Sequence, residues 1–186
     1  GSPTSPMRTA GPCRTSCRPT SCSGSPTSTW RPPSGFGAAA ARSFAHAGLD
    51  VAGVHLDRRA TLPLAEAVAK DVEAAGRRAR FWNANAADAE RRDAIVGELG
   101  ALLRGGPRVR VLLHSLAFGT LKPLVAADAK DAVSSVQVAM TLDVMASSLV
   151  GWTQALCAAD LFEPGARIFA MTSEGGTRAL PAYGPV

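Results

Sequence analysis

The sequence has no hydrophobic run long enough to cross a membrane. Its 186 residues are 46% hydrophobic, but no apolar stretch approaches the roughly 18–20 residues that a transmembrane helix needs. No G-x-S-x-G pattern occurs, so the chain offers no serine-hydrolase signature. Its length and composition predict a soluble globular domain with a real core, which we expect to be cytoplasmic.

Acidic residues are absent from residues 1–33, which hold four arginines. From Ser34 onward, 16 basic residues face 15 acidic ones, so the net charge of +5 comes mostly from the first segment. A nearly neutral body argues against a nucleic-acid-binding face. We predict that residues 1–33 are disordered, because so few apolar side chains cannot offset the entropy of ordering. A transit peptide would share this composition, but seven prolines oppose its helix, and a cloning remnant or an out-of-frame stretch accounts for it at least as well.

The cysteines and histidines form no metal-binding pattern. Cys13, Cys17 and Cys22 lack paired C-x-x-C spacing and have no histidine nearby, and the three histidines are scattered along the chain. We therefore expect no metal site. Cys157 falls in an apolar helical pattern and is predicted to be a small core residue.

Helical and strand patterns alternate strictly from Ser34 to Ser173. The predicted helices cover residues 34–48, 62–76, 88–104 and 129–161, the last as one helix or two; the predicted strands cover residues 49–57, 79–84, 108–115 and 165–173. This alternation predicts an α/β, Rossmann-like, doubly wound parallel sheet with helices on both faces, whose apolar strands are covered on both sides. Pro32 and Pro33 rule out an internal strand before the first helix, so we expect an incomplete sheet.

Ligands of doubly wound sheets bind at the carboxyl ends of the strands. The first candidate contacts are Ser34, Gly35, Phe36 and Gly37, at the start of a helix. Glycines there let a pyrophosphate approach the backbone, and a helix N-terminus favours its charge. The alternative is a plain N-terminal turn.

Two further candidates follow the next strands. Asp57 ends the second predicted element at a spacing that suits a carboxylate binding an adenosine ribose, whereas Arg58 and Arg59 suit a 2′-phosphate; a solvated charge cluster is the alternative. Asn85, with Ala86 beside it, could contact an adenine edge or simply form an Asx turn.

The strand "VRVLLHS" ends at another candidate wall of the site. Small side chains at Ser115 and Ala117 would let a flat nucleoside lie against the chain, with Leu116 between them. His114 is more often a satisfied histidine at the edge of a core than a ligand contact.

The last candidates follow the final strand. That strand ends at Thr172 and Ser173, and Tyr183, the only tyrosine of the chain, follows in a loop. A tyrosine can donate a proton to a carbonyl or enolate oxygen when a nearby cation lowers its pKa. An interfacial aromatic residue is the alternative.

Together these stretches, from Ser34 to Val186, resemble the short-chain dehydrogenase/reductase family, and within it the enoyl-[acyl-carrier-protein] reductase branch. "SGFG" looks like the end of the family's cofactor loop, and "HSLAFG" is similar to the segment of enoyl reductases beside the nicotinamide ribose. Asp143 stands where classical members have a catalytic asparagine, as it does in enoyl reductases. The resemblance implies that Tyr183 stabilises the enolate and that Thr172 or Ser173 lies near the family's catalytic serine.

The resemblance also implies the chemistry. A hydride would pass from NADH or NADPH to the C=C of an acyl thioester, carried by acyl carrier protein or coenzyme A, in fatty acid synthesis. The intact parent would be a homo-oligomer. The alternative within the family is a carbonyl reductase or alcohol dehydrogenase.

The chain departs from the family pattern at both ends. The family's first strand with its T-G pair is not evident, and its last strands and the lysine that follows its tyrosine are absent from the 186 residues, which end at Val186. We therefore expect the 186-residue chain to be inactive. A non-catalytic fragment that only associates with other subunits, or that aggregates through exposed strand edges, is the alternative of another class.

Overall fold

The computed structural model describes residues 35–178, 180, 182 and 183, all within the unit Pro32–Val186. The predicted disorder of residues 1–33 and the predicted phosphate contact at Ser34 lie outside the described residues. Within the described part of the chain, the helices are too short or too polar to span a membrane.

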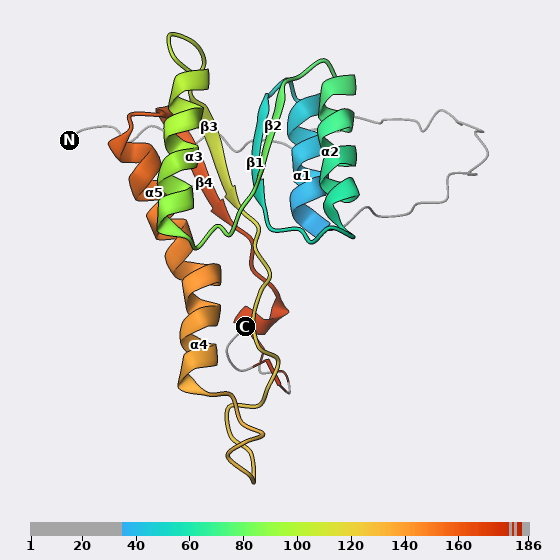
Figure 1. The fold of residues 1–186 in the computed structure, drawn as a ribbon, viewed down its shortest axis with the longest axis vertical. Coiled ribbons are helices and arrows are strands. Elements are labelled where there is room, and N and C mark those ends of the chain that lie inside the picture. Colours follow the sequence, from blue (N-terminus) through green and yellow to red (C-terminus); the bar gives the residue numbers. More distant parts are fainter. Residues whose placement is uncertain (1–34, 179, 181, 184–186) are drawn as a thin grey trace, which may run out of the picture. The chain divides into compact units, whose positions relative to one another are not determined.

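Helices and strands alternate along the described chain (Figure 1). They are α1 Gly35–His46, β1 Val51–His55, α2 Leu62–Ala74, β2 Ala79–Asn83, α3 Ala89–Leu102, β3 Val109–His114, α4 Ser135–Leu142, the π-helical turn η1 Asp143–Ser147, α5 Ser148–Ala158, β4 Phe162–Ala170 and the 3₁₀ turn η2 Glu174–Gly176. The predicted alternation is confirmed. Gly48 and Gly76 follow α1 and α2 with φ of 88° and 74°, conformations that glycine adopts at helix ends without strain.

The segment predicted for residues 129–161, as one helix or two, forms α4 and α5, but it begins at Ser135 rather than at residue 129. The helix begins after Ser134, whose side chain accepts a hydrogen bond from the Gln137 backbone N–H while the Gln137 side chain accepts one from the Ser134 backbone N–H. This capping box satisfies two otherwise unpaired donors and sets the start of α4. The π-helical turn η1 then separates α4 from α5.

The strands form two parallel pairs. β1 pairs with β2 in the register Val51 to Ala79, and β3 pairs with β4, with His114 opposite Ala170. In the described residues each sheet has two strands. The parallel strand pairs and the alternating helices agree with the predicted Rossmann-like α/β fold.

Two helix layers enclose the strands. α1 packs on α2 beside β1 and β2, and α3 packs on α5, on the other side of the strands in Figure 1. One hydrophobic core lies under α3 and α5 and draws on both sheets. It consists of Trp82, Ala84, Ile95, Val96, Trp152, Leu156 and Leu161, with Val54 of β1 and Leu112 of β3 packed against it.

Two sequence predictions about burial are wrong. Ile168 and Phe169 of β4 are 46% and 51% exposed, although this strand was expected to be covered on both sides. β4 pairs with β3 alone in the described residues, so its second edge contributes no burial. Cys157 is exposed rather than part of the core, because α5 turns Trp152 and Leu156 inward instead.

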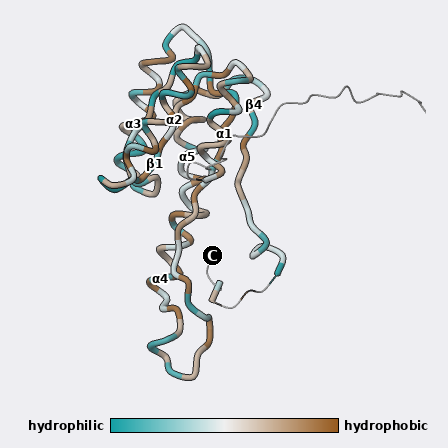
Figure 2. Tube along the Cα trace, turned by 90° about the vertical axis from the view of Figure 1, so that its right-hand side faces the viewer, coloured by the Kyte–Doolittle hydropathy of each residue, from teal (hydrophilic) through white to brown (hydrophobic). Residues whose placement is uncertain are grey.

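Apolar side chains also remain exposed around α4. They include Leu124 and Val125 in the preceding loop and Val136 and Met140 on the helix, where Figure 2 shows hydrophobic segments along the tube.

Candidate functional site

The start of α1 lies against the loop after β3. A side chain added at Gly37 would place its Cβ 3.5 Å from the Ser115 Oγ. Gly35 has φ of 85°, and a Cβ added there would meet nothing within 4 Å. Among the described residues, nothing therefore contacts Gly35 where a Cβ would lie, and the first turn of α1 carries no acidic residue. Phe36 is 77% exposed, so it contributes little packing in this arrangement.

A hydrogen-bonded cluster fixes the loop after β1. The His55 Nδ1 lies 2.7 Å from the Asp57 Oδ2. Asn83, at the end of β2, makes two hydrogen bonds to the Asp57 backbone. Its Oδ1 accepts from the Asp57 N–H at 3.0 Å, and its Nδ2 donates to the Asp57 carbonyl at 2.9 Å. Asp57 is thus held in place, while Arg58 and Arg59 beside it are exposed.

Sequence reasoning missed His55 and Asn83. The His-x-Asp spacing at the end of a strand was a usable signal for His55, because alternate residues point to the same side of a strand. Nothing in the sequence marks Asn83, which lies 26 positions from Asp57 and meets it only because β1 and β2 pair in parallel.

The predicted cofactor contacts Asn85 and Ala86 both take part in hydrogen bonds within the protein. The Asn85 Oδ1 accepts a hydrogen bond from the Ala87 N–H at 3.0 Å, which is the Asx turn that the sequence left open. The Ala86 carbonyl accepts a hydrogen bond from the Trp152 Nε1 at 2.9 Å. This loop is therefore tied to α5.

His114 is buried, with 8% of its surface exposed, and its Nε2 lies 2.8 Å from the Ser148 Oγ. The Ser148 hydroxyl donates to the Val144 carbonyl at 2.7 Å. A serine has one hydroxyl proton, so it accepts from His114, whose Nε2 carries the hydrogen. Burial lowers the pKa of His114 below its ordinary value. His114 is thus a satisfied histidine that joins β3 to α5, and Ser148 is a partner that the sequence did not reveal.

The residues after His114 line the end of β3. Ser115 and Leu116 are half-buried and Ala117 is exposed. The His114 carbonyl accepts a hydrogen bond from the Met171 N–H at 2.8 Å, so the segments after β3 and β4 leave the sheet together.

The predicted catalytic residues lie on three separate segments. Asp143 is exposed at the start of η1; π-helical turns within helices are frequent at functional sites. Ser173 caps η2 by accepting a hydrogen bond from the Gly175 N–H, with Thr172 before it. Tyr183 forms an isolated parallel bridge with Lys122. Among the described residues, no hydrogen bond joins these side chains.

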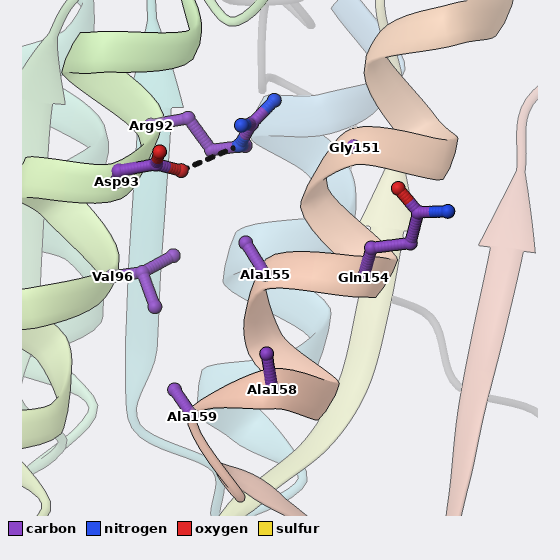
Figure 3. A pocket seen from close by; sticks show the side chains of 8 residues that line it. All are labelled: Arg92, Asp93, Val96, Gly151, Gln154, Ala155, Ala158 and Ala159. Atoms are coloured by element: carbon purple, nitrogen blue, oxygen red, sulfur yellow. Dashed lines mark hydrogen bonds and ion pairs between the residues drawn. The ribbon is translucent and has the colours of Figure 1, made fainter.

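A surface pocket of about 550 Å³ lies elsewhere, between α3 and α5. Figure 3 shows Arg92 and Asp93 of α3 on one side and Gly151, Gln154 and Ala155 of α5 on the other. None of the predicted site residues lines it. In the part of the chain that the structure describes, no group of three or more His, Cys, Asp or Glu side chains gathers as a metal site.

Comparison with known proteins identifies the class. A family model described as "Enoyl-(Acyl carrier protein) reductase" matches residues 32–186. The chain therefore belongs to the short-chain dehydrogenase/reductase family. A search of curated proteins finds no match.

Solved structures agree on the fold. A short-chain dehydrogenase/reductase from Serratia marcescens is 26% identical, with a TM-score of 0.63. A short-chain dehydrogenase from Burkholderia cenocepacia, solved in complex with NADP, is 27% identical, with a TM-score of 0.62. Each alignment covers 78% of this chain and 54% of the other. An acetoin dehydrogenase from Enterobacter cloacae, 21% identical, shows the fold alone, with a TM-score of 0.64 over 82% of this chain and 58% of its own. The chain thus spans little more than half the length of these relatives.

Proposed function

We propose that this chain carries the dinucleotide-binding part of an NAD(P)H-dependent reductase, and that the parent reaction is reduction of the C=C of an acyl thioester. The observation that carries the proposal is the close approach of the α1 N-terminus to the loop after β3, at Gly37 and Ser115. The family match supports it.

The residues present fit such a cofactor. The open first turn of α1, with the positive φ of Gly35, offers backbone N–H groups and a helix dipole to a pyrophosphate. Asp57 is positioned for a ribose hydroxyl, and the exposed Arg58 for a 2′-phosphate, so both NADH and NADPH stay open. Ser115 and Ala117 would face the nicotinamide side. When bound, the cofactor supplies the hydride.

The chain's own residues would orient the substrate and stabilise the charge that develops on it. We propose that Tyr183 stabilises the developing enolate oxygen, and that Thr172, Ser173 and Asp143 complete the substrate side. We further propose that the 186-residue chain alone does not turn over, since the described structure leaves these side chains on separate segments without mutual hydrogen bonds. An acyl carrier protein or coenzyme A thioester is the proposed partner, and the intact parent a cytoplasmic homo-oligomer.

A carbonyl reductase is the second candidate. The structural neighbours include an acetoin dehydrogenase and an alcohol dehydrogenase from Thermococcus sibiricus complexed with 5-hydroxy-NADP, both of which share the fold. Asp143 and the His114–Ser115 pair favour the enoyl reductase by resemblance.

Titration of the chain with NADH and NADPH, followed by calorimetry, tests the dinucleotide site. We expect saturable binding that Gly37→Val weakens at least about tenfold, because its branched side chain would fill the approach to Ser115. Asp57→Ala should weaken NADH more than NADPH, and Gly97→Ala, on the exposed side of α3, should change neither. Absence of saturable binding would refute the site.

Oxidation of NAD(P)H in the presence of a crotonyl thioester, or of acetoin, tests the reaction. We expect no turnover from the chain alone. Turnover with the thioester that is lost in Tyr183→Phe would contradict the proposed inactivity while supporting enoyl reduction, and turnover with acetoin alone would favour the second candidate.

A further inference from the structure

The side chains of His55 and Asp57 form a pair at the end of β1. The His55 Nδ1 lies 2.7 Å from the Asp57 Oδ2, and both side chains are largely shielded, with 20% and 26% of their surface exposed. An ionised carboxylate only accepts hydrogen bonds. The imidazole therefore donates from Nδ1, whether its ring is neutral or protonated, and one oxygen of the carboxylate is occupied.

Phe81 of the neighbouring strand restricts the position of the His55 ring. Gly53 and Phe81 are partners in the parallel register of β1 and β2, and a Cβ added at Gly53 would overlap the Phe81 ring. The glycine thus leaves room for that ring to lie over β1, where its centroid is 6.2 Å from that of the His55 ring at an interplanar angle of 60°. This tilted aromatic contact limits the positions that the imidazole can take.

The backbone of Asp57 is fixed independently of its side chain, through the two hydrogen bonds to Asn83. Among the hydrogen bonds of the described residues, only the Oδ2 of the Asp57 carboxylate takes part, which leaves its Oδ1 available to a ligand. Because the backbone and one carboxylate oxygen are both held, the carboxylate cannot turn away from a ligand without breaking the hydrogen bond from His55.

A fixed carboxylate discriminates between the two dinucleotides. A ribose 2′-hydroxyl can donate a hydrogen bond to the Asp57 Oδ1, whereas a 2′-phosphate brings further negative charge toward a carboxylate that cannot move aside. Arg58 and Arg59 follow Asp57 but are exposed, and water screens the attraction of an exposed cation. The held carboxylate therefore outweighs the two arginines and favours the hydroxyl.

We propose that His55 is a positioning residue that holds Asp57 in the orientation that accepts the ribose hydroxyl, and that this hydrogen bond makes the chain select NADH over NADPH. The inference rests on the proposed dinucleotide site. It gives His55 a role in cofactor selection rather than in the reaction, because the imidazole acts only through the carboxylate. A carboxylate released from His55 could move away from a 2′-phosphate, so loss of the imidazole reduces the discrimination.

Dissociation constants for NADH and NADPH, measured by calorimetry on the full chain, test the selection. We expect NADH to bind at least about tenfold more tightly than NADPH, and His55→Leu to weaken NADH about tenfold while changing NADPH less than about twofold. His55→Asn should retain most of the preference, since its amide nitrogen is bonded to Cγ as the imidazole Nδ1 is. In an Asp57→Ala background, His55→Leu should have no further effect. His46→Leu is the matched control, because His46 is exposed at the end of α1, and it should change neither constant.

Equal weakening of both dinucleotides by His55→Leu, or equal or tighter binding of NADPH by the unmodified chain, would overturn the inference while the dinucleotide site stands. Absence of saturable binding of either dinucleotide would refute the site and the inference together. A second measurement needs no cofactor: NMR of the ring nitrogens in the chain alone should show that the His55 Nδ1 carries a hydrogen, and that Asp57→Ala changes its resonance. A His55 ring protonated on Nε2 alone would also overturn the inference.

Discussion

Removing the Ser148 hydroxyl is expected to destabilise the chain by about 1–3 kcal/mol. That hydroxyl accepts from the His114 Nε2 at 2.8 Å and donates to the Val144 carbonyl at 2.7 Å. In Ser148→Ala the imidazole N–H stays buried without an acceptor, and a buried unsatisfied polar group costs an amount of this order. The change is small in volume, so the lost hydrogen bonds dominate the effect.

Urea unfolding followed by circular dichroism measures this loss. Ser147→Ala is the matched control, because Ser147 is exposed and makes no capping hydrogen bond through its side chain; we expect it to stay within about 0.5 kcal/mol of the parent chain. A double-mutant cycle with His114→Gln isolates the pair. If Ser148→Ala matches Ser147→Ala, or if the cycle shows no coupling, the argument that His114 joins β3 to α5 through Ser148 is refuted.

The pH dependence of stability and two glycine substitutions give further predictions. Burial lowers the pKa of His114 from 6.5, so below that pH the unfolded chain binds a proton that the folded chain does not. The free energy of unfolding should therefore fall as the pH falls from about 7.5 to about 5.5, by at most about 1.4 kcal/mol per pH unit; His114→Gln should flatten this dependence, and persistence of the full slope would count against it. Gly53→Ala should cost about 1–3 kcal/mol, because the new Cβ would lie 2.4 Å from the Phe81 ring. Gly97→Ala in α3 should stabilise by about 0.5–1 kcal/mol, since nothing lies within 4 Å; equal melting shifts for the two variants would contradict the packing at Phe81.

Local patterns were enough to predict the order of elements. Asp88, for example, precedes an amphipathic run and caps α3 through its side chain, which accepts from the Arg91 N–H at 3.1 Å, a contact that depends only on neighbours in sequence. The start of α4 was missed although it is also local. The run from Ala129 reads as helical, but the reciprocal bonds of Ser134 and Gln137 outweigh that propensity.

The site was predictable only in part, because its hydrogen bonds join distant residues. The pattern of strands was enough to place the ends of β1 and β3. It therefore indicated Asp57 and Ser115 as candidate cofactor contacts. The hydrogen-bond partners could not be predicted in the same way: Ser148 lies 34 positions from His114, and no spacing rule connects the two residues. The exposure of β4 was equally out of reach, because it depends on which strands are present beside it.

The same long-range contacts explain how two separate strand pairs share one candidate site. Backbone pairing does not join β1 to β3 among the described strands, so the relative position of their carboxyl ends depends on side-chain packing through α3 and α5. Trp152 contributes twice to that packing: its ring is buried in the common core, and its indole N–H bonds to the Ala86 carbonyl after β2.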